Sequence, residues 1–150
     1  MRDILFKGKR IFGEYWVCGD LIQFGNRTFI ANGWCLSVEE DDFDMFDCDI
    51  VYEVAPETVG QFTGIVDKND KQIFEGDIFQ LEDDVVAVVV FSDGCFRLEE
   101  YGLCGTWTES GYDECGGGYG IIECEPIDWY FLKDMEVIGN IHDNPDLIPH

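Results

Sequence analysis

Seven acidic side chains lie between residues 39 and 49, the densest group of potential ligands in the chain. Carboxylate oxygens suit hard cations such as Ca²⁺. A calcium loop beginning at Asp42 would need glycine at its sixth position, where this chain has Asp47. We therefore predict no metal site, and the group remains a candidate acidic surface made of Glu39, Glu40, Asp41, Asp42, Asp44, Asp47 and Asp49.

The seven cysteines and two histidines are the other side chains with metal-binding or nucleophilic chemistry. No two cysteines have the C-x-x-C spacing that lets a pair of thiolates hold one zinc ion. Thiol or serine catalysis needs a partner histidine, and His142 lies in a turn-like tail. No spacing among the 32 acidic residues singles out a catalytic pair. We predict free thiols, no cofactor, no catalytic residues and no enzymatic activity.

Residues 102–120 contain seven glycines and predict a mobile loop. Glycine-rich loops can also cradle phosphate with their backbone N–H groups. Here no lysine follows the glycines, the G-x-G-x-x-G spacing is missing, and the surrounding residues are acidic. The pattern therefore does not predict nucleotide binding.

The formal charge is −23, from 9 basic and 32 acidic residues. Such a surface repels phosphate and gains no counterion-release energy, which disfavours direct binding to nucleic acid. The longest apolar run, residues 85–91, is far shorter than the roughly 20 residues of a membrane helix. Residues 1–7 contain no apolar export segment, so we expect no membrane association and a cytoplasmic location.

Alternating polar and apolar residues dominate the chain and predict a mainly β fold in a single domain with little helix. Residues 48–54 predict an edge strand that Pro56 ends, which suggests subdomains at 1–54 and 55–150. The first subdomain is expected to be a β-meander with strands at 11–17, 21–24, 27–30 and 33–38 and turns at Gly19-Asp20 and Gly25-Asn26.

Residues 58–98 carry turn signals every eight to twelve positions, at 67–70, 82–84 and 92–94, which predicts a small SH3-like barrel completed by C-terminal strands. Its most buried strand is expected at 85–91, where β-branched residues are nearly continuous. The expected C-terminal strand segments are 127–132 and 135–141. Asn144-Pro145 predicts one helical turn, after which Leu147 and Ile148 dock the tail.

Several segments carry a resemblance to a known family. Residues 57–64 and 67–78 resemble the central motif of the YopX family of phage and prophage proteins. Residues 1–7 are similar to that family's opening, residues 135–147 to its ending, and residues 88–98 agree in order. The resemblance implies a phage or prophage accessory protein that acts inside a bacterial host, with a β-barrel-like structure, no established biochemical activity and no catalytic residues to transfer.

The sequence departs from the family pattern in two respects. The turn that commonly contains Asn-Gly in the family is Asn69-Asp70 here. The acidic segment 39–53 and the cysteine- and glycine-rich segment 102–126 are particular to this chain. Neither departure changes the family to which the resemblance points.

Polar residues beside the motif turns have two interpretations. Turn geometry alone accounts for many of them, yet they also suit a surface that binds a partner. Aromatic residues in the glycine-rich segment suit the same role, because aromatic side chains are enriched at interfaces. The candidate partner surface comprises Glu57, Thr58, Gln61, Thr63, Asp77, Trp107, Tyr112 and Tyr119.

Three functions therefore remain open. The leading hypothesis is a non-enzymatic protein-binding module with an unknown protein partner. An acidic DNA mimic that blocks a host nucleic-acid-binding protein is the first alternative, with the carboxylates of 39–49 as its face. An enzyme of unrecognised type is the second. Homo-oligomerisation is compatible with all three, since unpaired strand edges offer contacts.

Overall fold

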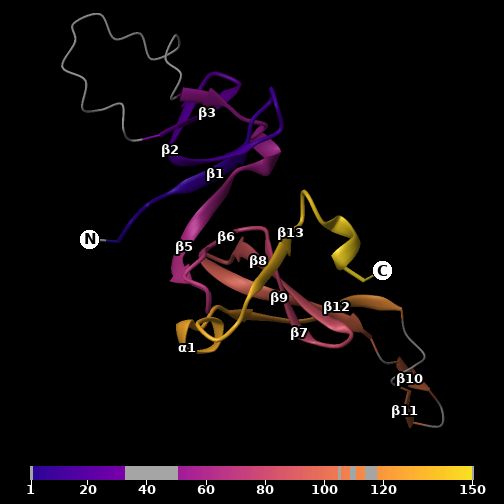
Figure 1. The fold of residues 1–150 in the computed structure, drawn as a ribbon. Helices are drawn as coiled ribbons and strands as arrows, with labels where there is room; N and C mark the ends of the chain where they lie inside the picture. Colours follow the sequence, from indigo (N-terminus) through magenta and orange to yellow (C-terminus); the bar gives the residue numbers. More distant parts are fainter. Residues whose placement is uncertain (1, 33–50, 105, 109–110, 114–117, 150) are drawn as a thin grey trace, which may run out of the picture. The chain divides into compact units, whose positions relative to one another are not determined.

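The computed structural model describes residues 2–32, 51–104, 106–108, 111–113 and 118–149 (Figure 1). The chain divides into two compact units, Met1–Gly64 and Ile65–His150. The sequence suggested a boundary at 54–55. The division lies later because strand β5 (Gly60–Val66) begins by pairing with strand β1 (Phe6–Lys9), with Lys7 opposite Gly60.

The first unit is built from antiparallel strands in the spatial order β4-β3-β2-β1-β5. A two-residue turn joins β2 to β3, because Phe24 pairs with Arg27 and Gly25 adopts a φ of +61°. This confirms the predicted turn at Gly25-Asn26. The further elements of the unit are β2 (Trp16–Phe24), β3 (Arg27–Ala31), the edge strand β4 (Val51–Glu53) and the 3₁₀ turn η2 (Pro56–Thr58).

Strand β2 corrects the predicted meander. A turn was expected at Gly19-Asp20, but the strand runs through both residues. A Cβ atom on Gly19 would lie 2.0 Å from the carbonyl oxygen of Ala31, so this glycine permits close strand approach and does not make a turn. The turn precedes β2, where Gly13 and Glu14 have φ values of +88° and +55°. The strand expected at 33–38 lies outside the described residues.

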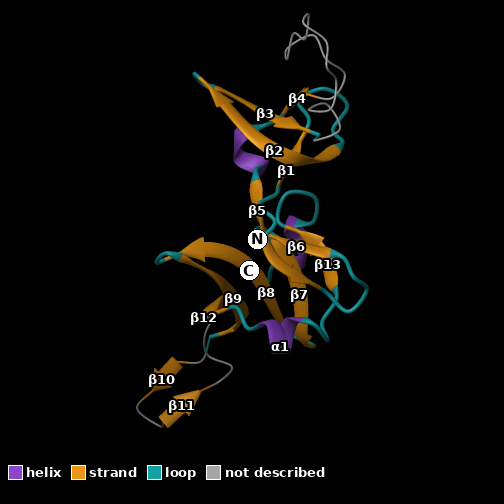
Figure 2. Cartoon of the chain, turned by 90° about the vertical axis from the view of Figure 1, so that its left-hand side faces the viewer, coloured by secondary structure: helices purple, strands orange, loops and turns teal. Residues whose placement is uncertain are grey.

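The second unit is centred on a five-stranded antiparallel sheet in the order β12-β9-β8-β7-β13 (Figure 2). The mainly β class is confirmed, but the expected SH3-like barrel is not closed. Over the described ranges, each edge strand pairs with one neighbour only, β12 with β9 and β13 with β7. The strands are β6 (Gln72–Phe74), β7 (Asp77–Glu82), β8 (Val85–Ser92), β9 (Cys95–Leu103), β12 (Tyr119–Pro126) and β13 (Val137–Asn140).

The middle strand β8 is the most buried, as its β-branched sequence predicted. Val86, Ala87, Val88 and Val89 are all buried, and they alternate between the two faces of the sheet. Ala87 and Val89 belong to the larger core, together with Phe79 and Leu132. Val86 and Val88 belong to a smaller core around Ile78, against which the tail residue Ile148 packs.

The turns of this unit confirm most of the predicted turn positions. The β8–β9 hairpin has the two-residue loop Asp93-Gly94, and both residues have positive φ, at 51° and 82°. That geometry matches the right-handed twist of the strands, which favours such turns in hairpins. The predicted turns at 67–70 and 82–84 also join successive strands, β5 to β6 and β7 to β8.

The glycine-rich segment 102–120 differs from the loop that was predicted. Strand β9 continues to Leu103, and β12 already begins at Tyr119. Gly102 lies inside β9, and a Cβ atom at this position would be 3.0 Å from Cδ1 of Ile122. Between these strands, β10 (Thr106–Thr108) and β11 (Gly111–Asp113) form a separate two-stranded sheet.

Among the described residues of the second unit, helical structure is confined to short turns. The segment expected as a strand at 127–132 instead forms the helix α1 (Trp129–Leu132). The predicted turn after Asn144 is confirmed as the 3₁₀ turn η3 (Pro145–Leu147). Among the described residues, no helix is long and apolar enough to cross a membrane.

Candidate functional site

Helix α1 is a single turn that local interactions hold in place. The Asp128 side chain caps its start by accepting a hydrogen bond of 2.8 Å from the backbone N–H of Tyr130. Leu132 closes the turn through its N–H bond to the Asp128 carbonyl, and its side chain is fully buried in the larger core. The sequence signal for this turn was an N-cap residue followed four positions later by an apolar anchor.

Three consecutive aromatic residues on this turn point outward. Trp129, Tyr130 and Phe131 are 59%, 69% and 45% exposed. The rings of Trp129 and Tyr130 meet edge to face, with centroids 6.4 Å apart. We call these three side chains the α1 aromatic surface. Large exposed aromatics on a rigid support are the groups that dominate protein interfaces, and sequence analysis missed them because it assigned a strand here.

Lys133 lies over the α1 aromatic surface. Its Nζ atom is 4.3 Å from the ring centroid of Tyr130 and 5.1 Å from that of Trp129. Both distances are within the range of a cation–π interaction. Two neighbouring rings of α1 therefore already accept an ammonium group.

The β5–β6 turn fixes the segment that follows α1. Asp67 accepts backbone hydrogen bonds from Asn69, Lys71 and Val137 at 2.8, 3.0 and 3.1 Å, and it is 3% exposed. The Lys68 N–H also donates to the carbonyl of Met135 at 2.9 Å. Burial raises the pKa of Asp67, but the three N–H donors outweigh it and leave that pKa below its ordinary value.

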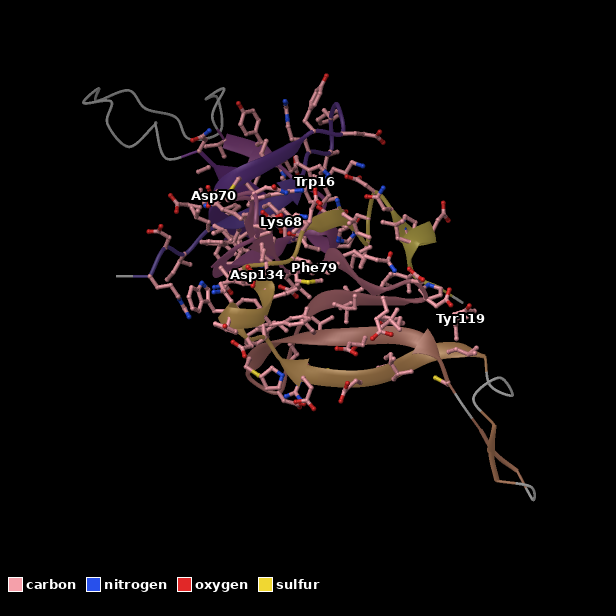
Figure 3. The ribbon with its side chains drawn as sticks, turned by 60° about the horizontal axis from the view of Figure 1, so that its bottom comes forward. Trp16, Lys68, Asp70, Phe79, Tyr119 and Asp134 are labelled. Atoms are coloured by element: carbon pink, nitrogen blue, oxygen red, sulfur yellow. The ribbon has the colours of Figure 1, made fainter. Side chains whose placement is uncertain are left out.

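Lys68 adds an ion pair at the same turn, with its Nζ atom 3.3 Å from Glu136. Figure 3 labels Lys68 together with Asp134, which follows α1 in the chain. Both partners of the ion pair are about half exposed, with side-chain exposures of 49% and 53%, so its contribution to stability is small. The buried Asp67 bonds, and not this pair, hold the turn to β13.

Part of the predicted partner surface lies in the interior. Thr58, Thr63 and Asp77 are at most 8% exposed, so they cannot form an accessible surface in this structure. Thr58 Oγ1 accepts from the Lys9 N–H and donates to the Ala55 carbonyl. Asp77 accepts a 2.8 Å bond from the Phe74 N–H and thereby closes the turn before β7. Thr58 and Asp77 therefore serve turn geometry, whereas Thr63 is buried within strand β5.

The other predicted partner residues are spread over the chain. Glu57 is exposed and Gln61 half-buried in the first unit, whereas Tyr119 is 42% exposed in the second. Trp107 and Tyr112 pair directly across the β10–β11 ladder. These residues are thus divided between the two units. The predicted acidic face at 39–49 lies outside the described residues.

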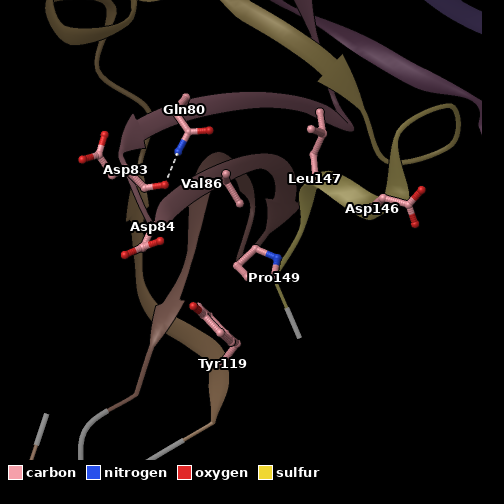
Figure 4. A pocket seen from close by; sticks show the side chains of 8 residues that line it. All are labelled: Gln80, Asp83, Asp84, Val86, Tyr119, Asp146, Leu147 and Pro149. Atoms are coloured by element: carbon pink, nitrogen blue, oxygen red, sulfur yellow. Dashed lines mark hydrogen bonds between the residues drawn. The ribbon is translucent and has the colours of Figure 1, made fainter. Parts of the chain in front are cut away.

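A shallow pocket lies beside Tyr119 (Figure 4). Its volume is about 170 Å³, and it opens between the β7–β8 turn and the C-terminal tail. The Gln80 amide donates to the carbonyls of Asp83 and Val85, both at 3.3 Å, so it serves the turn. The lining residues are Gln80, Asp83, Asp84, Val86, Tyr119, Asp146, Leu147 and Pro149.

Like charges face one another across strands β9 and β12. Glu100 lies directly opposite Glu123, an arrangement that destabilises a strand pair. Burial is the main cause that raises the pKa of Glu100, and the charges of Glu123, Glu125 and Glu82 raise it further. These carboxylates form an acidic stripe on ordered strands, in addition to the segment that the sequence singled out.

The described cysteines, Cys18, Cys95, Cys104 and Cys124, are free thiols, as predicted. Burial raises the pKa of Cys18, and the charge of Lys7 offsets part of that rise. A raised pKa disfavours the nucleophilic thiolate. Within the described ranges, no three His, Cys, Asp or Glu side chains are placed to hold a metal ion.

Together these features define a small two-unit β protein whose motif residues support turns and whose α1 presents aromatic side chains. A family model described as YopX protein matches residues 16–149, nearly the whole chain. The chain belongs to the YopX family. A search of curated proteins finds no match.

Proposed function

We propose that this chain is a phage- or prophage-encoded accessory protein that binds a protein partner in the cytoplasm of a bacterial host, without catalysing a reaction. The α1 aromatic surface is the proposed contact. Membership of the YopX family supports the phage origin. The observation that carries the binding role is the exposure of Trp129 and Tyr130, at 59% and 69%, on a turn anchored by the buried Leu132.

Exposure of these aromatic rings to water is unfavourable in free energy. Complete burial of an aromatic side chain removes roughly 150–250 Å² of surface from water. The loss of conformational entropy is small when the side chain is already ordered. Leu132 and the Asp128 cap hold the backbone of α1, so the rings are presented on a fixed support. A central aromatic pair flanked by charged residues is typical of an interface hot spot.

Capture from a bacterial lysate with matched variants tests this proposal. The double variant W129A/Y130A removes the proposed contact, and Y15A is the control, since Tyr15 is 67% exposed in the first unit. We expect wild type and Y15A to retain one protein that W129A/Y130A loses. Equal retention by all three proteins would contradict the role of α1.

The acidic DNA mimic is the second candidate, and the stripe of Glu100, Glu123 and Glu125 favours it. Strands that keep like charges opposed retain an unfavourable interaction, which a basic partner would relieve. This candidate expects capture of a nucleic-acid-binding protein that is lost as salt rises and weakened in E100Q/E123Q. Binding that is insensitive to salt and to this double variant would remove it.

A further inference from the structure

We infer that the α1 aromatic surface binds a lysine or arginine side chain presented by a basic segment of the protein partner, and that Lys133 occupies this position in the free protein. The inference rests on the proposed function and adds the chemistry of the partner. Its starting observation is that one ammonium group, Nζ of Lys133, already lies within 5.1 Å of both the Trp129 and Tyr130 centroids.

Three other cation–π contacts of the described residues lie on less exposed rings: Trp16 and Tyr52 are half-buried and Phe29 is buried. The Arg27 guanidinium lies 5.0 Å from the ring of Phe29, which is only 4% exposed. Arg27 is also held by Glu53 through two hydrogen bonds of 3.0 and 2.8 Å. That contact joins β3 to β4, and its ring face is not accessible to another molecule.

Lys133, in contrast, is held only lightly. Within the part of the chain that the structure describes, Lys133 forms no ion pair, unlike Arg27, Lys68 and Arg97. The two rings beneath it are more than half exposed. A lysine on an exposed ring gains little free energy over water, so another cation can replace it at small cost.

Charge around α1 favours a basic occupant. Between residues 119 and 137 the chain has five acidic side chains and one basic side chain, Lys133, and Lys68 of the β5–β6 turn pairs with one of the acidic ones, Glu136. All five acidic side chains are exposed. With a formal charge of −23 on the whole chain, this region attracts a positive segment and repels an acidic one. The acidic side chains are Glu123, Glu125, Asp128, Asp134 and Glu136.

The exchange involves no covalent change. A partner guanidinium or ammonium takes the place of the Lys133 Nζ over the rings, and Lys133 moves into solvent. Arginine is favoured over lysine, because its flat guanidinium stacks on a ring and is more weakly hydrated. Lys133 thus acts as an internal competitor, and its removal should strengthen binding.

A peptide titration of the full chain tests the inference. The probe is a Gly-Arg repeat peptide, and the control peptide has citrulline in place of each arginine, which removes the charge and keeps the shape. Binding is followed through the NMR signal of the Trp129 indole N–H at low ionic strength, with assignment by W129F. We expect the arginine peptide to shift this signal and the citrulline peptide to leave it unchanged.

Variants then separate local exchange from general electrostatics. K133Q and K68Q each remove one positive charge, but only Lys133 lies over the rings. We expect K133Q to bind the peptide about two- to fivefold more tightly than K68Q does, which corresponds to one exposed cation–π contact. Y130A should weaken binding and Y15A should not. Equal affinities of K133Q and K68Q, or binding of the citrulline peptide, would overturn the inference.

The peptide result and the lysate result fail independently. If capture depends on Trp129 and Tyr130 while the peptide does not bind, the partner is not basic at α1, and the inference fails while the proposed function stands. If the peptide binds as expected but no captured protein depends on α1, the proposed function fails and the cation site stands.

Discussion

The β5–β6 turn contacts the segment that follows α1 in the second unit, yet the turn and α1 differ in what their key side chains contact. At the turn, Asp67 is buried and each of its three hydrogen bonds ends on the protein's own backbone. On α1, Trp129 and Tyr130 are exposed, and the ammonium group of Lys133 lies over both rings.

This difference separates residues that hold the backbone near the site in place from residues whose side chains are proposed to contact a partner. Asp67 and Lys68 bond to Val137 and Met135, directly after α1, so the turn positions the chain that leaves the helix. Asp67 and Lys68, which belong to the motif segment 67–78, therefore stabilise the fold. The residues proposed for binding come from a segment whose pattern is local and inconspicuous.

The largest expected effect comes from breaking the turn. In D67A, three backbone N–H groups lose their acceptor, one of them that of the buried Val137 on strand β13. We expect a loss of about 2–4 kcal/mol in the free energy of unfolding, because buried unsatisfied donors are costly. Urea denaturation measures it. D84A, which removes an exposed carboxylate from another turn, should change stability by less than about 0.5 kcal/mol.

The same carboxylate predicts a pH dependence with a definite sign. Since the pKa of Asp67 is lowered in the folded protein, its contribution is full above the unfolded value near 3.8 and is lost as pH falls through the folded pKa. We expect the stability difference between wild type and D67N to be constant near neutrality and to shrink under acid. A difference that is the same at pH 7 and in strong acid would contradict this account of the turn.

A smaller effect is expected from the cap of α1. D128A removes the acceptor for the Tyr130 N–H, and loss of such a cap costs about 0.5–2 kcal/mol. Because Leu132 stays anchored in the core, we expect the fold to persist while the aromatic rings become less well ordered. Thermal denaturation gives the stability change, and broadening of the Trp129 indole signal reports the order of the helix.

The smallest effect concerns Asp70, which has a φ of +60° at the position where the family commonly has glycine. Left-handed backbone is strained for most side chains and only mildly so for Asp, whereas glycine adopts it freely. We expect D70G to stabilise the protein by less than about 1 kcal/mol. Destabilisation in the same urea assay would show that the Asp70 side chain has a role beyond the turn.

Much of the fold followed from local patterns in the sequence. The β-branched run of β8 predicted the middle strand, and Asp93-Gly94 and Gly25-Asn26 predicted their hairpins. Long-range contacts were not predictable in this way. Gly19 suggests a turn in sequence, and only the approach of Ala31 from the neighbouring strand shows why glycine stands inside β2.

The candidate site was predictable only in part, for the same reason. Thr58 and Asp77 look like accessible polar residues in sequence, and their burial depends on the tertiary fold. For α1, the sequence of alternating and aromatic residues at 127–132 fits a strand as well as a turn of helix. The cap by Asp128 and the anchor at Leu132 decide between them, and the anchor depends on the packed core.

The most direct test of the account is the comparison of partner capture by wild type, W129A/Y130A and Y15A from the same lysate, with folding of each checked by urea denaturation. The account predicts that W129A/Y130A keeps the stability of wild type and loses a protein that Y15A retains. Retention of every captured protein by a folded W129A/Y130A variant would contradict it.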